Sequence, residues 1–89
     1  MFNEEMIDKL ISLDRDGFTM TKDASYILYL FDREQHFEVR LEHRFIDRYD
    51  RKENSIYLEH FDIPRDHSPK KYLLEMLNER GLLVGGKTR

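Results

Sequence analysis

The sequence contains no cysteine, which excludes both a disulfide framework and a metal site built from thiolates. It also has no apolar run close to the roughly 18–20 residues that a membrane-spanning helix needs. The first five residues have neither the basic start nor the apolar core of a signal peptide. We therefore expect a cytoplasmic protein with no membrane partner.

Neither sign of charge dominates the chain, whose net charge is −3 over 89 residues. Residues 1–35 carry −4, residues 36–67 carry −2 and residues 68–89 carry +3. This distribution is typical neither of a nucleic-acid-binding protein nor of a strong DNA mimic. Charged residues make up 37% of the chain, against a usual share of about 25%, which indicates a highly solvated surface.

Helices are expected at both ends of the chain. Phe2, Met6 and Leu10 recur at helical spacing, Asn3 can cap the first helix, and Gly17 is expected to end it. Near the C-terminus, Ser68 and Pro69 are typical of a helix start, and Gly81 of a helix end. Residues 85–89 are expected to form a flexible basic tail.

Between the helices, alternating apolar and polar residues predict strands at 26–31, 36–45 and 55–61. The sequence therefore predicts one α+β domain over residues 1–84: a helix, a three-stranded antiparallel meander and a C-terminal helix. A fourth short strand at 18–22 is left open.

The second strand predicts two different faces of the sheet. Phe37, Val39 and Leu41 should point to the core, while the alternate charged residues point outward. If residues 32–35 form the loop, Tyr29 lies opposite Glu38 on the outward face. On the third strand, Tyr57, Glu59 and Phe61 join this face if Ile56 and Leu58 point to the core.

This mixed aromatic and charged face is the best candidate for partner binding, because Tyr, Phe and Arg are enriched in protein interfaces. The candidate residues are Tyr29, Phe31, Glu38, Arg40, Glu42, Arg44 and Tyr57. An unknown protein partner or a homodimer is favoured. The alternative is that a helix covers these aromatics as ordinary core.

Weak binding of single-stranded nucleic acid is the first alternative function. The same aromatics could stack on bases, and Lys70, Lys71, Lys87 and Arg89 could contact phosphates. Interleaved carboxylates on the sheet face would repel a phosphate backbone, so nucleic acid is the less favoured partner.

A small metal-dependent or oligomeric enzyme is the second alternative. His43 and His60 could begin a metal site, but the sequence shows no obvious third ligand. Residues 81–88 match the letters of a phosphate-binding loop, yet they follow a helix rather than a strand. Asp66, His67 and Ser68 spell a hydrolase triad, but contiguous residues do not converge as a triad requires. We expect no cofactor and favour a non-catalytic role.

The helix–meander–helix layout resembles that of many small accessory proteins of bacteriophages and mobile elements, including some anti-CRISPR inhibitors. The resemblance rests on the layout and the density of charge, with no motif to support it. It implies an interaction or regulatory module, which is our leading hypothesis.

Overall fold

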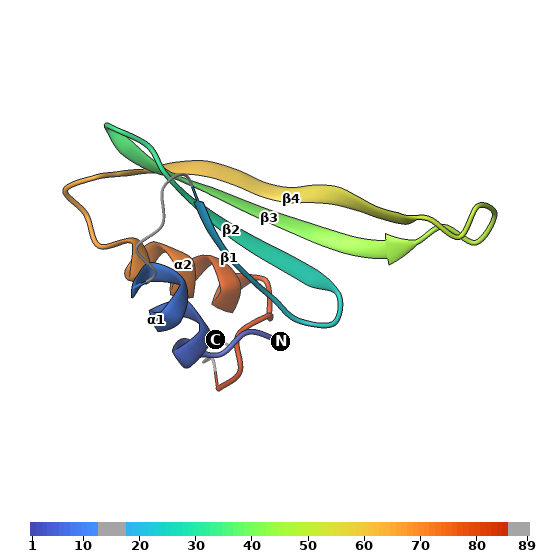
Figure 1. The fold of residues 1–89 in the computed structure, drawn as a ribbon. Helices are drawn as coiled ribbons and strands as arrows, with labels where there is room; N and C mark the ends of the chain where they lie inside the picture. The colour runs from blue at the N-terminus through green and yellow to red at the C-terminus, as the bar shows by residue number, and fades with distance from the viewer. Residues whose placement is uncertain (13–17, 86–89) are drawn as a thin grey trace.

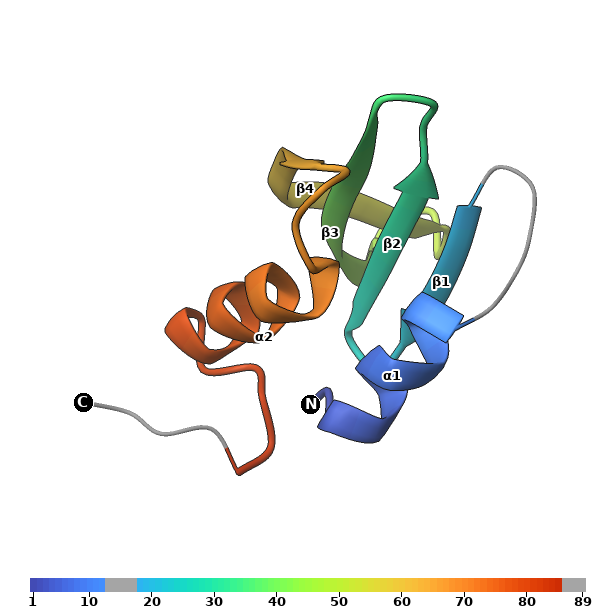
Figure 2. The same ribbon diagram turned by 90° about the vertical axis from the view of Figure 1, so that its left-hand side faces the viewer.

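The computed structural model describes residues 1–12 and 18–85 and shows an α+β fold. Four antiparallel strands form one sheet in the order β1-β2-β3-β4, and both helices lie against the same face of it (Figures 1 and 2). The elements are α1 (Glu4–Ser12), β1 (Phe18–Lys22), β2 (Tyr26–Asp32), β3 (His36–Ile46), β4 (Glu53–Pro64) and α2 (Pro69–Glu79).

The strand left open by the sequence is present as β1, which pairs antiparallel with β2 from Phe18 opposite Phe31 to Lys22 opposite Ile27. Its two faces differ because side chains alternate along a strand. Thr19 is buried, and its hydroxyl donates a hydrogen bond to the carbonyl of Leu10 in α1 at 2.9 Å. This bond ties the edge of the sheet to the first helix.

The register between β2 and β3 differs by two residues from the one expected. Tyr29 lies opposite Arg40, not Glu38. The turn is tighter than four residues, since the N–H of Arg33 donates to the carbonyl of His36 at 3.0 Å. A shift of two residues leaves every side chain on its predicted face, because the side-chain period of a strand is two.

Strand β4 contains a β-bulge that changes which of its side chains face outward. Leu41 lies opposite Glu59, whereas Glu42 lies opposite Tyr57, so Leu58 is the extra residue. Tyr57 therefore points outward as expected, but the expectation for Glu59 and Phe61 is wrong. Phe61 packs against the core, and its neighbours His60 and Asp62 point outward instead.

The core lies between the sheet and the two helices. Its fully buried side chains are Phe2, Ile7, Leu10, Leu28, Val39, Leu41, Ile63, Leu73 and Leu77. Phe2 also joins the two ends of the described chain: its N–H donates to the carbonyl of Leu82 at 2.8 Å, and its carbonyl accepts from Val84 N–H at 2.7 Å. The segment after α2 is thereby held against the segment before α1.

The start of α1 and both ends of α2 follow the predicted signals with one exception. Asn3 caps α1 through its Oδ1, which accepts the N–H of Met6 at 2.8 Å. Gly81 ends α2 with a φ of 71°, and the N–H of Leu82 donates back to the carbonyl of Leu77 at 2.8 Å. Ser68 occupies the N-cap position of α2, but its side chain makes no capping hydrogen bond.

Two predicted features cannot be compared with the structure. The helix exit at Gly17 lies outside the described residues, and so does the tail beyond Gly85.

We predict that Phe2→Ala lowers the free energy of unfolding by about 3–5 kcal/mol, because it removes a fully buried ring and leaves a cavity. Denaturant unfolding followed by circular dichroism measures this. Phe45→Ala is the matched control, since Phe45 is 39% exposed, and it should cost less than about 1 kcal/mol. Equal effects of the two changes would contradict the assignment of Phe2 to the core.

Candidate functional site: the open face of the sheet

The face of the sheet turned away from both helices carries most of the candidate residues (Figures 1 and 2). We call it the open face. The register places on it Phe18, Met20, Lys22, Ile27, Tyr29, Phe31, His36, Glu38, Arg40, Glu42, Arg44, Ile46, Glu53, Ser55, Tyr57, His60, Asp62 and Pro64. The aromatics of β2 are therefore not covered by a helix.

One half of the open face, along β1 and β2, is aromatic. The ring of Phe18 lies 5.5 Å from that of Phe31 and 6.1 Å from that of Tyr29, and the last two rings stack at 5.8 Å. Phe18 and Met20 are 46% and 41% exposed. An apolar strip of this kind next to polar residues is typical of interaction surfaces.

Arg40 lies at the centre of the open face among aromatic rings. Its guanidinium carbon is 4.8 Å from the ring centre of Phe31, 4.9 Å from that of Tyr57 and 5.9 Å from that of Tyr29. These cation–π contacts hold the planar group in a narrow range of orientations.

The side chain of the same arginine makes no hydrogen bond within the part of the chain that the structure describes, and its Nε is buried without a partner. The nearest carboxylate oxygens are those of Glu38 at 3.6 Å and Glu42 at 3.9 Å, which is too far for a hydrogen bond. A buried donor without an acceptor is uncommon and costs free energy. The Arg40 side chain is 24% exposed, so the accessible part of its guanidinium can still donate a hydrogen bond to an oxygen of a partner.

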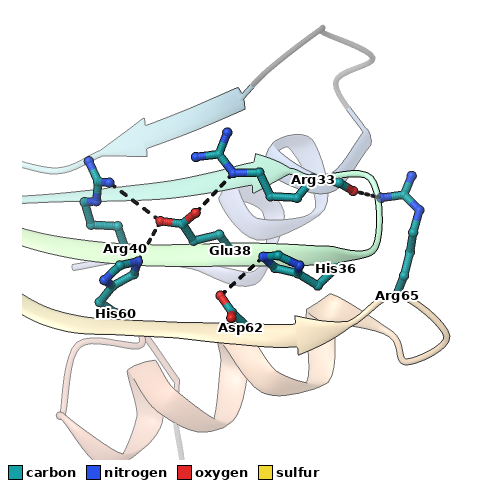
Figure 3. Close-up of polar contacts among 7 residues, drawn as sticks. All are labelled: Arg33, His36, Glu38, Arg40, His60, Asp62 and Arg65. Carbon is teal, nitrogen blue, oxygen red and sulfur yellow. Dashed lines mark hydrogen bonds and ion pairs between the residues drawn. The ribbon is translucent and has the colours of Figure 1, made fainter.

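Glu38 lies at the centre of a polar cluster that joins the β2–β3 turn to β4 (Figure 3). Its Oε1 accepts a hydrogen bond from Nε of Arg33 at 3.1 Å, and its Oε2 lies 2.6 Å from Nε2 of His60. The hydrogen bond with His60, followed by that with Arg33, lowers the pKa of the Glu38 carboxyl below its ordinary value despite partial burial. Glu38 is therefore an ionised, well-anchored group at neutral pH.

Beyond Glu38, the cluster continues to the end of the sheet. His36 lies 3.6 Å from the carboxylate of Asp62, and Arg65 pairs with Asp32 and donates to the carbonyl of Arg33 at 2.8 Å (Figure 3). These contacts tie the β2–β3 turn to the end of β4.

Glu42 is the least satisfied carboxylate of the open face. It is only 7% exposed, and its only ion pair in the described chain is the 3.9 Å contact with Arg40. Burial raises the pKa of the Tyr29 hydroxyl, and the charge of Glu42 raises it further. The hydroxyl of Tyr29 therefore stays protonated and can donate a hydrogen bond to a partner.

The open face as a whole is electrically balanced. Its four cationic side chains, Lys22, Arg40, Arg44 and, from the β2–β3 turn, Arg33, match four carboxylates, Glu38, Glu42, Glu53 and Asp62. Arg44 already has a partner, since its Nε and Nη2 both lie 2.5 Å from Glu53. The face therefore offers no excess of positive charge to a phosphate backbone.

The basic residues proposed for nucleic acid do not meet the aromatics. Lys70 lies in α2, on the helix side of the sheet, and pairs with Glu4 at 3.1 Å and Asp8 at 2.8 Å. Lys71 lies on the same helix, whereas Lys87 and Arg89 fall outside the described residues.

The two candidate metal ligands lie on opposite faces of the sheet. His60 is opposite Arg40 on the open face, while His43 is opposite Ile56 on the helix side, with its ring 5.1 Å from that of Tyr26 and tilted by 43° to it. Across residues 1–12 and 18–85, the structure shows no group of three or more side chains that could hold a metal ion.

A separate pocket of about 190 Å³ lies beside the start of α2. Its lining residues are His67, Ser68, Lys71, Tyr72 and Glu75. Asp66 and His67 are joined by a 2.9 Å contact, but the described contacts include no hydrogen bond between His67 and the hydroxyl of Ser68. The nucleophile and the base of a triad are therefore not connected here.

Sequence reasoning missed Phe18 and Met20 as members of the open face, because the strand that carries them was left open. The alternation of apolar residues with Thr19 and Thr21 was the available signal. It also missed Arg33, which reaches Glu38 from a turn, where no periodicity indicates the direction of a side chain.

Comparison of the chain with protein families, with curated proteins and with solved structures found no match. Among the described residues, neither helix is long and apolar enough to cross a membrane. The function must therefore be argued from the open face itself.

We predict that Glu38→Gln lowers the free energy of unfolding by about 1 kcal/mol near neutral pH, because the ionised carboxylate is bonded to His60 and Arg33. The pKa of Glu38 is lower in the folded chain, so its stabilisation is complete above the unfolded pKa and is lost as the pH falls through the folded pKa. The difference from wild type should vanish in acid.

Denaturant unfolding of both proteins across this pH range measures the effect. Asp62→Asn is the matched control, since Asp62 is 63% exposed and lies 3.6 Å from His36 without a hydrogen bond. A difference for Glu38→Gln that persists unchanged below the folded pKa would contradict the assigned role of the charge.

Proposed function

We propose that this chain is a non-catalytic interaction or regulatory module that docks on another protein through the open face. The observation that carries the proposal is Arg40, an arginine held by three aromatic rings on a face that neither helix covers, whose Nε has no hydrogen-bond partner among the described residues. Arginine and tyrosine are the residues that most often dominate binding energy at protein interfaces.

The side chains at the centre of the open face are already held in place in the single chain, which also supports docking. Arg40 and the ring of Tyr29 are packed in place, so little side-chain freedom remains to be lost when a partner arrives. The exposed edge of the aromatic strip, Phe18 and Met20, supplies apolar area, and the cluster around Glu38 supplies a polar rim. This combination is the usual composition of a protein interface.

Single-stranded nucleic acid is less favoured as the ligand. The open face has equal numbers of positive and negative side chains, and Lys70 is paired on the other side of the sheet. Binding of phosphates depends on several unpaired cations acting together.

The resemblance of the layout to accessory proteins of bacteriophages and mobile elements suggests the context of such a module. A regulatory protein of this size would act by occupying a surface of a larger protein with its docking face.

We predict that the double variant Tyr29→Ala, Arg40→Ala loses its partner in a pull-down from lysate of the source organism, while the circular dichroism spectrum stays that of the folded chain. The variant removes the stacked ring and the central cation of the face. Mass spectrometry of the retained material, with and without nuclease, gives the readout.

The matched control is Tyr49→Ala, Arg48→Ala, which changes the same residue types in the β3–β4 loop, where Tyr49 is 99% exposed. A stoichiometric protein that survives nuclease and is lost only in the open-face variant supports the proposal. Equal retention by both variants removes the open face as the docking site. Loss of all material after nuclease replaces a protein partner with nucleic acid.

A further inference from the structure

The charges on the outward side of β3 alternate as Glu38, Arg40, Glu42 and Arg44. Because the order reads glutamate–arginine in one direction and arginine–glutamate in the other, the row is complementary to its own reverse. Two copies of the row laid face to face in opposite directions place each glutamate against an arginine. The row therefore matches the open face of a second copy of this chain.

We propose that the open face binds a second copy of this chain about a two-fold axis, with Arg40 of each copy paired to Glu42 of the other. The inference rests on the proposed function, because it names the partner of the same face. Such a contact is isologous, since one surface patch meets an identical patch. Two sheets packed in this way lie about 10 Å apart.

The contacts inside one chain indicate where the axis passes. Glu38 and Arg44, at the ends of the row, are already hydrogen-bonded to Arg33 and to Glu53. The side chains of Arg40 and Glu42, at its middle, make no hydrogen bond within the described chain, and their ion pairs there are long, 3.9 Å to each other and 3.6 Å from Arg40 to Glu38. These two side chains therefore lie on either side of the axis. The guanidinium of one copy supplies hydrogen-bond donors, and the carboxylate of the other copy supplies the acceptors.

The usual cost of burying a charge pair is reduced at this position. The side chains of Arg40 and Glu42 are only 24% and 9% exposed in the single chain. Much of their hydration is therefore lost on folding, before any partner binds, and a closely placed opposite charge recovers part of that loss. Association through these two groups is favoured over association through fully solvated charges.

The same axis also brings together aromatic and apolar side chains of the two copies that can pack against each other. Tyr29 lies beside Arg40 and Ile27 beside Glu42, so the ring of Tyr29 meets Ile27 of the second copy. On β4, His60 lies beside Arg40 and Tyr57 beside Glu42, so these two rings also meet across the axis. The aromatic strip is thereby covered without placing like charges together.

Charge reversal tests this pairing directly. Sedimentation velocity should show a dimer for the wild-type chain and at least about 100-fold weaker association for R40E or E42R alone, since each puts like charges together twice per dimer. The double variant R40E/E42R should dimerise again. A mixture of the two single variants should form a heterodimer, because one copy then presents two carboxylates and the other two guanidinium groups.

Lys71→Glu is the control, because it reverses an exposed charge on α2, on the other side of the sheet, and should leave the dimer unchanged. If a single variant does not fold by circular dichroism, dilution of the wild-type chain followed by NMR decides. The amide signals of Tyr29, Arg40 and Glu42 should then shift with concentration, while those of α2 do not.

A wild-type chain that stays monomeric at every concentration would overturn the inference, and so would a dimer that none of the charge reversals affects. These results do not by themselves contradict the proposed function. A monomeric chain that still loses a lysate partner in the Tyr29→Ala, Arg40→Ala variant leaves docking through the open face intact and excludes only the second copy as its occupant.

Discussion

The bulge at Leu58 in β4 determines what the open face carries. Without the extra residue, alternation along the strand would keep Glu59 and Phe61 on the side of Tyr57 and would turn His60 inward. With it, Phe61 packs against the core while His60 reaches Glu38. Arg80 at the end of α2 holds this geometry, since its Nη2 donates to the carbonyl of Leu58 at 2.8 Å and its Nε to Glu59 at 2.7 Å. The bulge in this edge strand thus places Phe61 against the core and His60 on the open face.

The polar contacts of the open face follow from the position of both helices on the other side of the sheet. Charged side chains in the middle of an uncovered sheet are shielded from water by neighbouring side chains but not by a second layer of helices or strands. Glu38 therefore gathers Arg33 and His60, and Arg44 pairs with Glu53. The side chains of Arg40 and Glu42 are left without hydrogen bonds among the described residues: Arg40 lies among aromatic rings, and Glu42 is 3.9 Å from it.

Most of the fold could be predicted from local signals, because each has a direct physical cause. Helical spacing indicated α1, and a glycine in the left-handed region ended α2. The faces of β3 followed from strict alternation, even though the register was wrong by two residues. The bulge could not be predicted, since Leu58 and Phe61 are both apolar and no turn residue marks the insertion. The cluster around Glu38 depends on that bulge and on a turn residue, Arg33, so it was beyond the same reasoning.

The balance of charge on the open face limits which partners suit it. A phosphate backbone needs a surplus of cations, and a strongly basic protein needs a surplus of carboxylates, yet this face has neither. A partner must instead present both signs in a matching order together with apolar area for Phe18 and Tyr29. Because Arg40 is already oriented by three rings, the position of its missing acceptor is set before any partner arrives. In the proposed interaction, the order of the charges on the partner would therefore matter more than its net charge.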